Sequence, residues 1–131
     1  MSVRTFMQMS LAVGGALLAG CTTQLTYNND IVLVNTCGVP LEIESHGSSN
    51  FLPPIPAHVI APGERAYVAS YLSYGEDVSP QITCSYWLTV KGPERTRTVT
   101  ADELRYAVAK VKREKNGRLR SWSIVDGSFC P

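Results

Sequence analysis

The chain has 131 residues, 44% of them hydrophobic, and carries 12 Lys and Arg against 11 Asp and Glu, a formal net charge of +1. This length suffices for one domain with a modest core. The sequence contains no internal repeat, no low-complexity tract and, beyond its N-terminal segment, no apolar run long enough to span a bilayer. These features exclude a repeat protein and a further membrane span.

The N-terminal segment has the pattern of an export signal. Residues 1–20 contain one charge, Arg4, then a mostly apolar stretch over 6–18 and two small residues. A charged start, an apolar core and a small-residue end are typical of a secretory signal peptide. The apolar part is shorter than the roughly 20 residues that span a bilayer. The alternative, a buried helix of the fold, is disfavoured by three glycines.

The end of this segment, Leu18-Ala19-Gly20-Cys21, resembles the lipobox of bacterial lipoproteins in all four positions. In that family a peptidase cuts before the cysteine, which then receives acyl chains. Several buried chains anchor a protein stably where one does not. Thr22 follows Cys21, in place of the Asp that commonly retains Gram-negative members in the inner membrane. The resemblance therefore implies lipidation at Cys21, anchoring in the outer membrane and a domain that faces the periplasm.

Removal of the signal changes the charge balance. Residues 21–29 are polar and predict a lipidated N-terminus with a tether, followed by a β-rich domain over 30–131. Loss of Arg4 leaves 11 basic and 11 acidic residues. The neutral total hides a split, because residues 21–90 hold one basic and six acidic residues, whereas residues 91–131 hold ten basic and five acidic ones. The mature chain is therefore predicted to be polarised.

The first half of the domain predicts short strands. Residues 31–34 form a β-branched run, and residues 41–44 alternate apolar and acidic side chains, as in a strand with one solvated face. Residues 45–56 predict a loop, and residues 57–60 a further short strand. Pro62-Gly63 predicts a type II turn, and 65–72 a strand with Tyr67, Ala69 and Tyr71 on one face.

The second half starts with the strongest strand pattern, Gln81 to Lys91, with Cys84 in its apolar phase and Trp87 in its polar phase. Residues 95–100 predict the returning strand. A capping box over 100–103 predicts a helix start. Asn116-Gly117 favours a hairpin, so we expect a helix near 101–106 and strands at 108–114 and 118–125; the alternative is a helix to about 115.

Short strands separated by turns predict a mainly β fold: a small antiparallel β-sandwich or partly open barrel with one short helix. Besides Cys21, the sequence has Cys37, Cys84 and Cys130. An oxidising compartment favours a disulfide, although an odd cysteine count leaves three pairings open. Cys37 and Cys130 follow the first and last predicted strands. They would meet at one end if those strands ran parallel, so we favour this pair and a buried Cys84.

The sequence carries no recognisable catalytic set. His46 and His58 match no common zinc spacing, and Gly-x-Ser-x-Gly, Walker and dinucleotide motifs are missing from the chain. We therefore expect neither an enzyme nor a bound metal or cofactor.

Two segments are candidates for binding. One is the proline-stiffened stretch 51–56, which would otherwise pack over the end of the sandwich. The other is a run of basic residues over 105–120, where Glu114 is the single acidic residue. This run is either the solvated face of a hairpin or helix or a surface for an anionic partner. The run comprises Arg105, Lys110, Lys112, Arg113, Lys115, Arg118 and Arg120.

The leading hypothesis is a lipid-anchored, non-catalytic protein with a binding or assembly role at the cell envelope. Its partners would be the membrane, through the anchor, and an envelope protein or anionic surface, with no nucleic acid. The alternative is an inhibitor or immunity-type lipoprotein directed against a cell-wall or toxin enzyme, by analogy with small disulfide-tied β domains.

Overall fold

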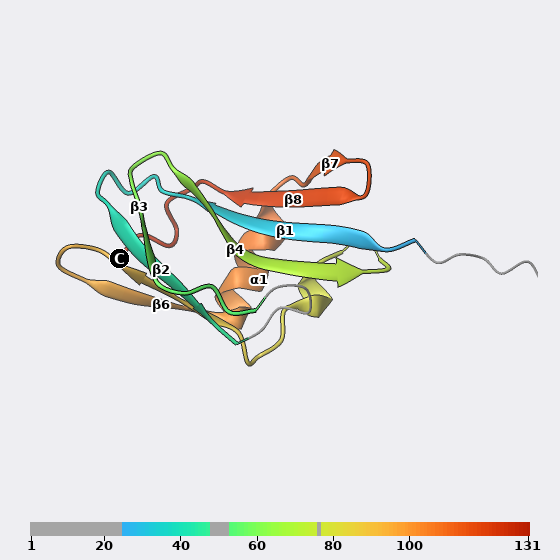
Figure 1. Cartoon of the computed structure of the whole chain (residues 1–131), viewed down its shortest axis with the longest axis horizontal. Helices are drawn as coiled ribbons and strands as arrows, with labels where there is room; N and C mark the ends of the chain where they lie inside the picture. Colours follow the sequence, from blue (N-terminus) through green and yellow to red (C-terminus); the bar gives the residue numbers. More distant parts are fainter. Residues whose placement is uncertain (1–24, 48–52, 76) are drawn as a thin grey trace, which may run out of the picture.

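The computed structural model describes residues 25–47, 53–75 and 77–131. The predicted signal peptide and Cys21 lie outside these ranges. Within them, no helix is both long and apolar enough to cross a membrane. The described chain forms two open four-stranded sheets and one short α-helix, which confirms a mainly β, sandwich-like fold (Figure 1).

Sheet A has the strand order β4-β1-β8-β7, and sheet B has the order β3-β2-β5-β6. In chain order the elements are β1 (Tyr27–Val34), β2 (Leu41–His46), β3 (His58–Ile60), β4 (Arg65–Ser73), the 3₁₀ turn η1 (Ser79–Gln81), β5 (Trp87–Lys91), β6 (Thr96–Thr100), α1 (Ala101–Lys110), β7 (Glu114–Asn116) and β8 (Leu119–Ile124).

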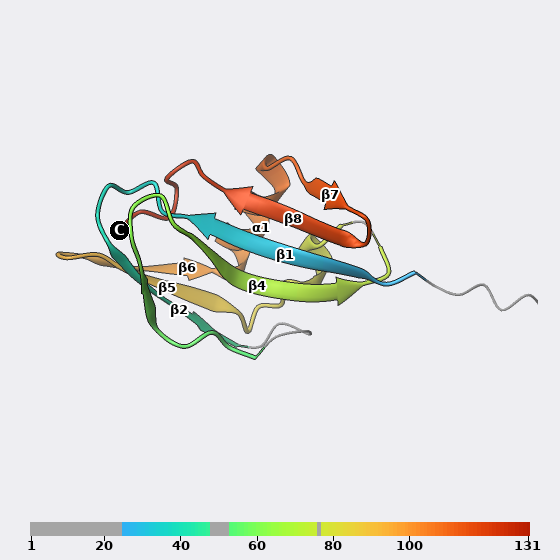
Figure 2. The same ribbon diagram turned by 45° about the horizontal axis from the view of Figure 1, so that its top comes forward.

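The first and last strands are neighbours and run parallel. Asn28 pairs with Leu119, and Leu33 pairs with Ile124. Every other strand pair in the described residues is antiparallel, and the parallel β1–β8 pair is the arrangement on which the predicted disulfide depended. A parallel pair needs a crossover connection. Here α1 connects sheet B to sheet A, and the chain then turns through β7 into β8 (Figure 2).

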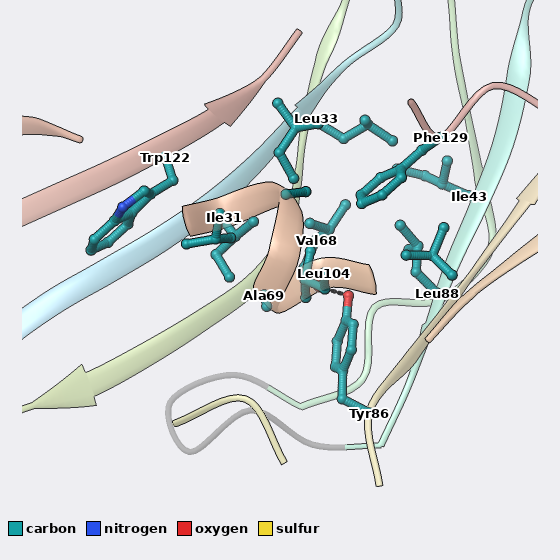
Figure 3. Packing of buried hydrophobic residues seen from close by; sticks show 14 of the residues in the cluster. Ile31, Leu33, Ile43, Val68, Ala69, Tyr86, Leu88, Leu104, Trp122 and Phe129 are labelled. Atoms are coloured by element: carbon teal, nitrogen blue, oxygen red, sulfur yellow. Dashed lines mark hydrogen bonds between the residues drawn. The ribbon is translucent and has the colours of Figure 1, made fainter. Parts of the chain in front are cut away.

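The core fills the space between the sheets, and α1 contributes to it directly. Leu104 is fully buried, and Figure 3 shows it between Ala69 of sheet A and Leu88 of sheet B. The hydroxyl of Tyr86 donates a hydrogen bond of 2.7 Å to the carbonyl oxygen of Val68. Burial raises the pKa of this phenol, which therefore stays protonated as a donor.

Helix α1 begins at the predicted capping box. The hydroxyl of Thr100 accepts from the Glu103 amide, and the Glu103 carboxylate accepts from the Thr100 amide at 2.8 Å. The helix continues to Lys110, beyond the predicted end near 106, because Ala107 and Val108 are buried against the core on the same face as Leu104. Both sequence alternatives were thus wrong about its length.

The predicted hairpin after the helix is confirmed, with shifted bounds. Asn116 pairs with Leu119, so Gly117 and Arg118 form the turn. Gly117 has a φ of 61°, and a glycine with positive φ at the first central position is the pattern of a type II′ turn. The strand predicted over 108–114 is therefore only Glu114–Asn116, since the helix occupies the residues before it.

The long strand predicted over 81–91 is wrong in its first half. Residues 79–81 form η1, and the Tyr86 amide donates to the Thr83 carbonyl in a turn. The side chain of Arg105 donates a hydrogen bond of 2.8 Å to the Ile82 carbonyl, so this carbonyl is not part of a strand ladder. Cys84 is exposed, which corrects its expected burial. Strand β5 starts only at Trp87.

An irregularity between β1 and β4 overturns the face assigned to Tyr67. Ile31 pairs with Ala69 but Val32 pairs with Tyr67, so Val68 is an extra residue on β4. Such a bulge reverses the side-chain alternation. Ala69 and Tyr71 are buried in the core, whereas Tyr67 is 59% exposed on the outer face of sheet A.

The domain starts earlier than predicted. Strand β1 begins at Tyr27, three residues inside the stretch assigned to the tether. Asn29 is fully buried, and its side-chain amide donates to the Tyr71 carbonyl at 3.0 Å and to the Ser73 hydroxyl at 2.8 Å. Polarity of the segment predicted a tether, but these partners on β4 satisfy the donors of the buried amide nitrogen.

The predicted disulfide between Cys37 and Cys130 is confirmed, with Cα atoms 5.6 Å apart. The parallel arrangement of β1 and β8 brings both cysteines to one end of the domain, as expected. Asn35, also buried there, donates to the Val39 and Ile60 carbonyls and accepts from the Cys37 amide. The bridge and these bonds fix the end of the domain that carries the C-terminus (Figure 2).

Candidate functional site

The outer face of sheet B presents an exposed aromatic side chain in a polar surround. Inward residues of β2, β5 and β6 enter the core, so the alternate residues point away from it. Three cross-strand rows result, joined by the pairings of β5 with β2 and β6. We call this surface the Trp87 face; its residues are Glu42, Glu44, His46, Trp87, Thr89, Lys91, Thr96, Thr98 and Thr100.

Trp87 and His46 form the centre of the Trp87 face. They are cross-strand partners, and their rings stack with centroids 4.7 Å apart and an interplanar angle of 7°. His46 Nε2 lies 3.1 Å from the Thr89 hydroxyl and 4.0 Å from a Glu44 oxygen. Trp87 nevertheless remains 43% exposed. The imidazole thus holds the indole in one orientation while part of the indole stays available for contact.

The chemistry of the Trp87 face suits binding. A tryptophan fixed on a sheet offers a large contact area at little cost in side-chain entropy. Threonine hydroxyls on β5 and β6 add hydrogen-bonding groups around it. Within residues 25–47, 53–75 and 77–131, no three His, Cys, Asp or Glu side chains are grouped so as to hold a metal ion.

The outer face of sheet A differs from the Trp87 face. Its hollow of about 320 Å³ is lined by Asp30, Arg65, Tyr67, Glu114 and Leu119, among others. The polar groups there bond to their own sheet: the Ser70 hydroxyl donates to Asp30 at 2.6 Å, and Arg65 donates to Ser123 at 2.8 Å. Tyr67 is exposed on this face and provides a comparison for Trp87.

The structure does not place the seven predicted basic residues on one face. Arg105 points to the loop before β5, where it contacts Ile82 and Cys84, and it also pairs with Asp102 of its own helix. The ammonium of Lys110 lies 3.8 Å from the ring centre of Tyr106. Arg105 and Lys110 therefore both contact other residues of the domain at α1.

Arg120 is the clearest exception to a surface role. It is 3% exposed, its guanidinium lies 3.4 Å from the ring centre of Tyr27, and it donates to the Gly75 carbonyl at 3.3 Å. It thus packs within the domain. The remaining four, Lys112, Arg113, Lys115 and Arg118, lie in and just before the β7–β8 hairpin. Of these, Arg113 is half-buried and the other three are exposed.

His58 and residues 53–56 of the proline-rich segment lie at the edge of sheet B. His58 starts β3, and its Nδ1 lies 3.1 Å from the Pro56 carbonyl. Phe51 and Leu52 of the proline-rich segment lie outside the described residues. Ile55 is attached to β2, because its amide donates to the Ser45 hydroxyl at 2.6 Å and its carbonyl accepts from the Ser45 amide. The described part of this segment therefore packs along the sheet.

Sequence reasoning missed the pairing of Trp87 with His46. A signal was present, since Trp87 occupies the polar phase of its strand beside Thr89. Its partner could not be found, because His46 lies 41 positions earlier and the register between β2 and β5 is a tertiary property. Comparisons of the chain with protein-family models, with curated proteins and with solved structures found no match.

Proposed function

We propose that this chain is a lipid-anchored, non-catalytic binding protein at the periplasmic face of the outer membrane, and that the Trp87 face binds an envelope protein. The observation that carries the proposal is the exposed indole of Trp87, held by His46 on a rigid sheet. The Leu18–Cys21 motif supports the anchor. The Cys37–Cys130 bridge supports an oxidising compartment such as the periplasm.

The charge on the Trp87 face favours a protein partner over an anionic surface. Two carboxylates, Glu42 and Glu44, accompany one lysine, Lys91. An anionic polymer or lipid headgroup would be repelled by this balance. Protein interfaces, in contrast, commonly have a tryptophan at the centre and polar residues at the rim. The arrangement around Trp87 has both properties.

Metabolic labelling with a fatty-acid probe tests the anchor. We expect the native protein to take up the probe and the Cys21→Ser variant to take up none, because the thiol is the expected acylation site. Membrane fractionation of both proteins accompanies the labelling. Labelling that persists in Cys21→Ser, or none in the native protein, would contradict the lipid anchor.

Photo-crosslinking in intact cells tests the binding surface. A photoreactive residue at Thr98, which is exposed next to Thr89 on the Trp87 face, should yield a discrete protein adduct. The same residue at Tyr67 on sheet A is the matched control. Adding Trp87→Ala should reduce the Thr98 adduct at least tenfold, as expected for a central interface residue. Equal adducts from both positions, or no adduct from Thr98, would rule the surface out.

The identity of the adduct separates assembly from inhibition. A structural envelope protein would indicate an assembly role. A cell-wall hydrolase or toxin enzyme that loses activity in the complex would indicate an inhibitor or immunity-type lipoprotein, which uses the same surface.

A further inference from the structure

The β7–β8 hairpin lies at the end of the domain where the described chain begins. The Asn28 amide donates to the Arg118 carbonyl at 2.9 Å, so the hairpin turn is attached to the first strand. Figure 2 shows the start of β1 and this turn at one end of the molecule, and the C-terminus at the other. The disulfide marks the opposite end, which we call the distal end.

Basic and amphipathic side chains gather at the hairpin end. Lys115 and Arg118 are exposed at the turn, and Lys112 is exposed just before β7. Tyr74, which follows β4, is 63% exposed, and Leu25 is 47% exposed. Ser73, the last residue of β4, pairs with Tyr27 at the start of β1, which places Tyr74 and Leu25 near the same end. Tyrosine and basic side chains together are typical of groups at a membrane interface.

Among the described residues, the acidic side chains near the hairpin end lie away from the turn. Glu114 pairs with Ser121, on the far side of Lys115 from the turn. Asp77 lines a hollow beside α1 together with Arg113. The turn itself, 115–118, contains two cations and no carboxylate. The local charge there is therefore positive, although the mature chain is neutral.

Arg120 makes the hairpin end rigid. Its guanidinium contacts Tyr27 of β1 and the carbonyl of Gly75 after β4, while its backbone belongs to β8. One buried side chain thereby joins three chain segments. The cations of the turn are consequently presented in a fixed direction relative to β1.

The distance from Cys21 brings this end close to the bilayer. Tyr27 lies six positions after Cys21, which is at most about 20–22 Å of extended chain. An acylated Cys21 would thus hold the hairpin end within about 2 nm of the headgroups. Electrostatic attraction extends about 8 Å at physiological ionic strength, so the domain needs only a small reorientation to bring its cations into range.

We propose that the β7–β8 hairpin, with Tyr74 and Leu25, is a membrane-apposed surface that orients the domain against anionic phospholipid headgroups of the leaflet holding the anchor. This inference rests on the lipid anchor of the proposed function. It leaves the Trp87 face for the protein partner. Each cation near an anionic surface is expected to favour the apposed state about fivefold.

Lysine footprinting of the full lipidated protein tests this orientation. The protein is inserted into nanodiscs of phosphatidylcholine alone or with phosphatidylglycerol, and acetylation rates are measured by mass spectrometry. We expect acetylation of Lys115 to slow at least threefold on the anionic discs and to recover in high salt. Lys91, exposed at the distal end of β5, is the internal control and should not change.

Charge-reversal variants sharpen the result. Lys112→Glu combined with Arg118→Glu should abolish the lipid-dependent protection of Lys115. Arg65→Glu combined with Arg95→Glu makes the same charge change at the distal end and should leave that protection intact. Unchanged acetylation of Lys115 on anionic discs, or equal protection of Lys115 and Lys91, would overturn the proposed orientation. A protein without acyl mass that fails to insert into discs would instead contradict the anchor of the proposed function.

Discussion

The two ends of the domain are held by different kinds of interaction. At the distal end, a covalent bridge joins Cys37 to Cys130 across a sequence separation of 93. At the hairpin end, the start of β1 is held by backbone pairing and by one buried cation, Arg120, against Tyr27. The parallel β1–β8 pair is therefore held twice, once by a covalent bond and once by packing around a buried charge.

Removing the bridge should have the largest effect. In the loop-entropy model, a bridge that closes a loop of this length contributes roughly 4–5 kcal/mol. We expect the double variant Cys37→Ser and Cys130→Ser to lose about that much free energy of unfolding. Guanidinium titration, followed by tryptophan fluorescence, measures it. A loss below about 1 kcal/mol would show that the distal end is held mainly by other contacts.

Replacing the buried cation, Arg120, should cause the next largest loss of free energy of unfolding. Arg120→Met keeps much of the side-chain volume but removes the contact with the Tyr27 ring and the bond to Gly75. We expect a loss of about 2 kcal/mol, because a desolvated cation–π contact and a charge-assisted hydrogen bond disappear together. Urea titration measures the change, and Arg118→Met at the exposed turn is the matched control, with about 0.5 kcal/mol or less expected. Equal stability losses in the two variants would show that the contacts of Arg120 do not stabilise the hairpin end.

Changes to the capping box at the start of α1, the helix between the two ends, should have a smaller effect on the free energy of unfolding. This effect should depend on pH. The backbone hydrogen bond with Thr100 lowers the pKa of Glu103 from its ordinary 4.5, with the Arg97 guanidinium also contributing. The resulting stabilisation is complete above the unfolded-state pKa and is lost as pH falls through the lower folded-state pKa.

Thr100→Ala should therefore cost about 1 kcal/mol at neutral pH, and Glu103→Gln should flatten part of the stability loss between about pH 5 and pH 3. Thermal unfolding across this range provides the measurement. A variant with the same acid sensitivity as the native protein would show that the capping box contributes nothing to it.

The smallest effect is expected at the third cysteine of the domain. Cys84 is exposed and belongs to neither end, so Cys84→Ser should change the free energy of unfolding by about 0.5 kcal/mol or less. Differential scanning calorimetry can measure it next to the bridge variant. A loss above about 1 kcal/mol would show that the contact between Cys84 and Arg105 stabilises the loop before β5.

Local patterns predicted much of the fold. Alternation in residues 41–44, the turn glycine at 117 and the capping box at Thr100 each produced a correct element, because each depends on neighbours within a few positions. The bounds were less accurate. The helix end and the start of β5 depend on what Val108 and Ile82 contact in the folded chain, which their local sequence does not encode.

The candidate sites depended much more on tertiary structure. The basic run was visible in the sequence, but the burial of Arg120 and the engagement of Arg105 were not. The Trp87 face needed the register of β2 against β5, which brings together residues far apart in the chain. Charge and periodicity indicate that a segment has a polar face, whereas they do not indicate which segment lies opposite.

The sequence predicted a mainly β fold, as a sandwich or a partly open barrel, because strand and turn patterns are local properties. It favoured Cys37 and Cys130 as the bridged pair among three open pairings, on the condition that the first and last strands run parallel. Folding in three dimensions sets β1 and β8 parallel, stacks Trp87 on His46 and packs Arg120 on Tyr27. These three contacts join segments separated by dozens of residues. Their geometry follows from the pairing and register of strands that are distant in the chain, and no short stretch of sequence specifies it.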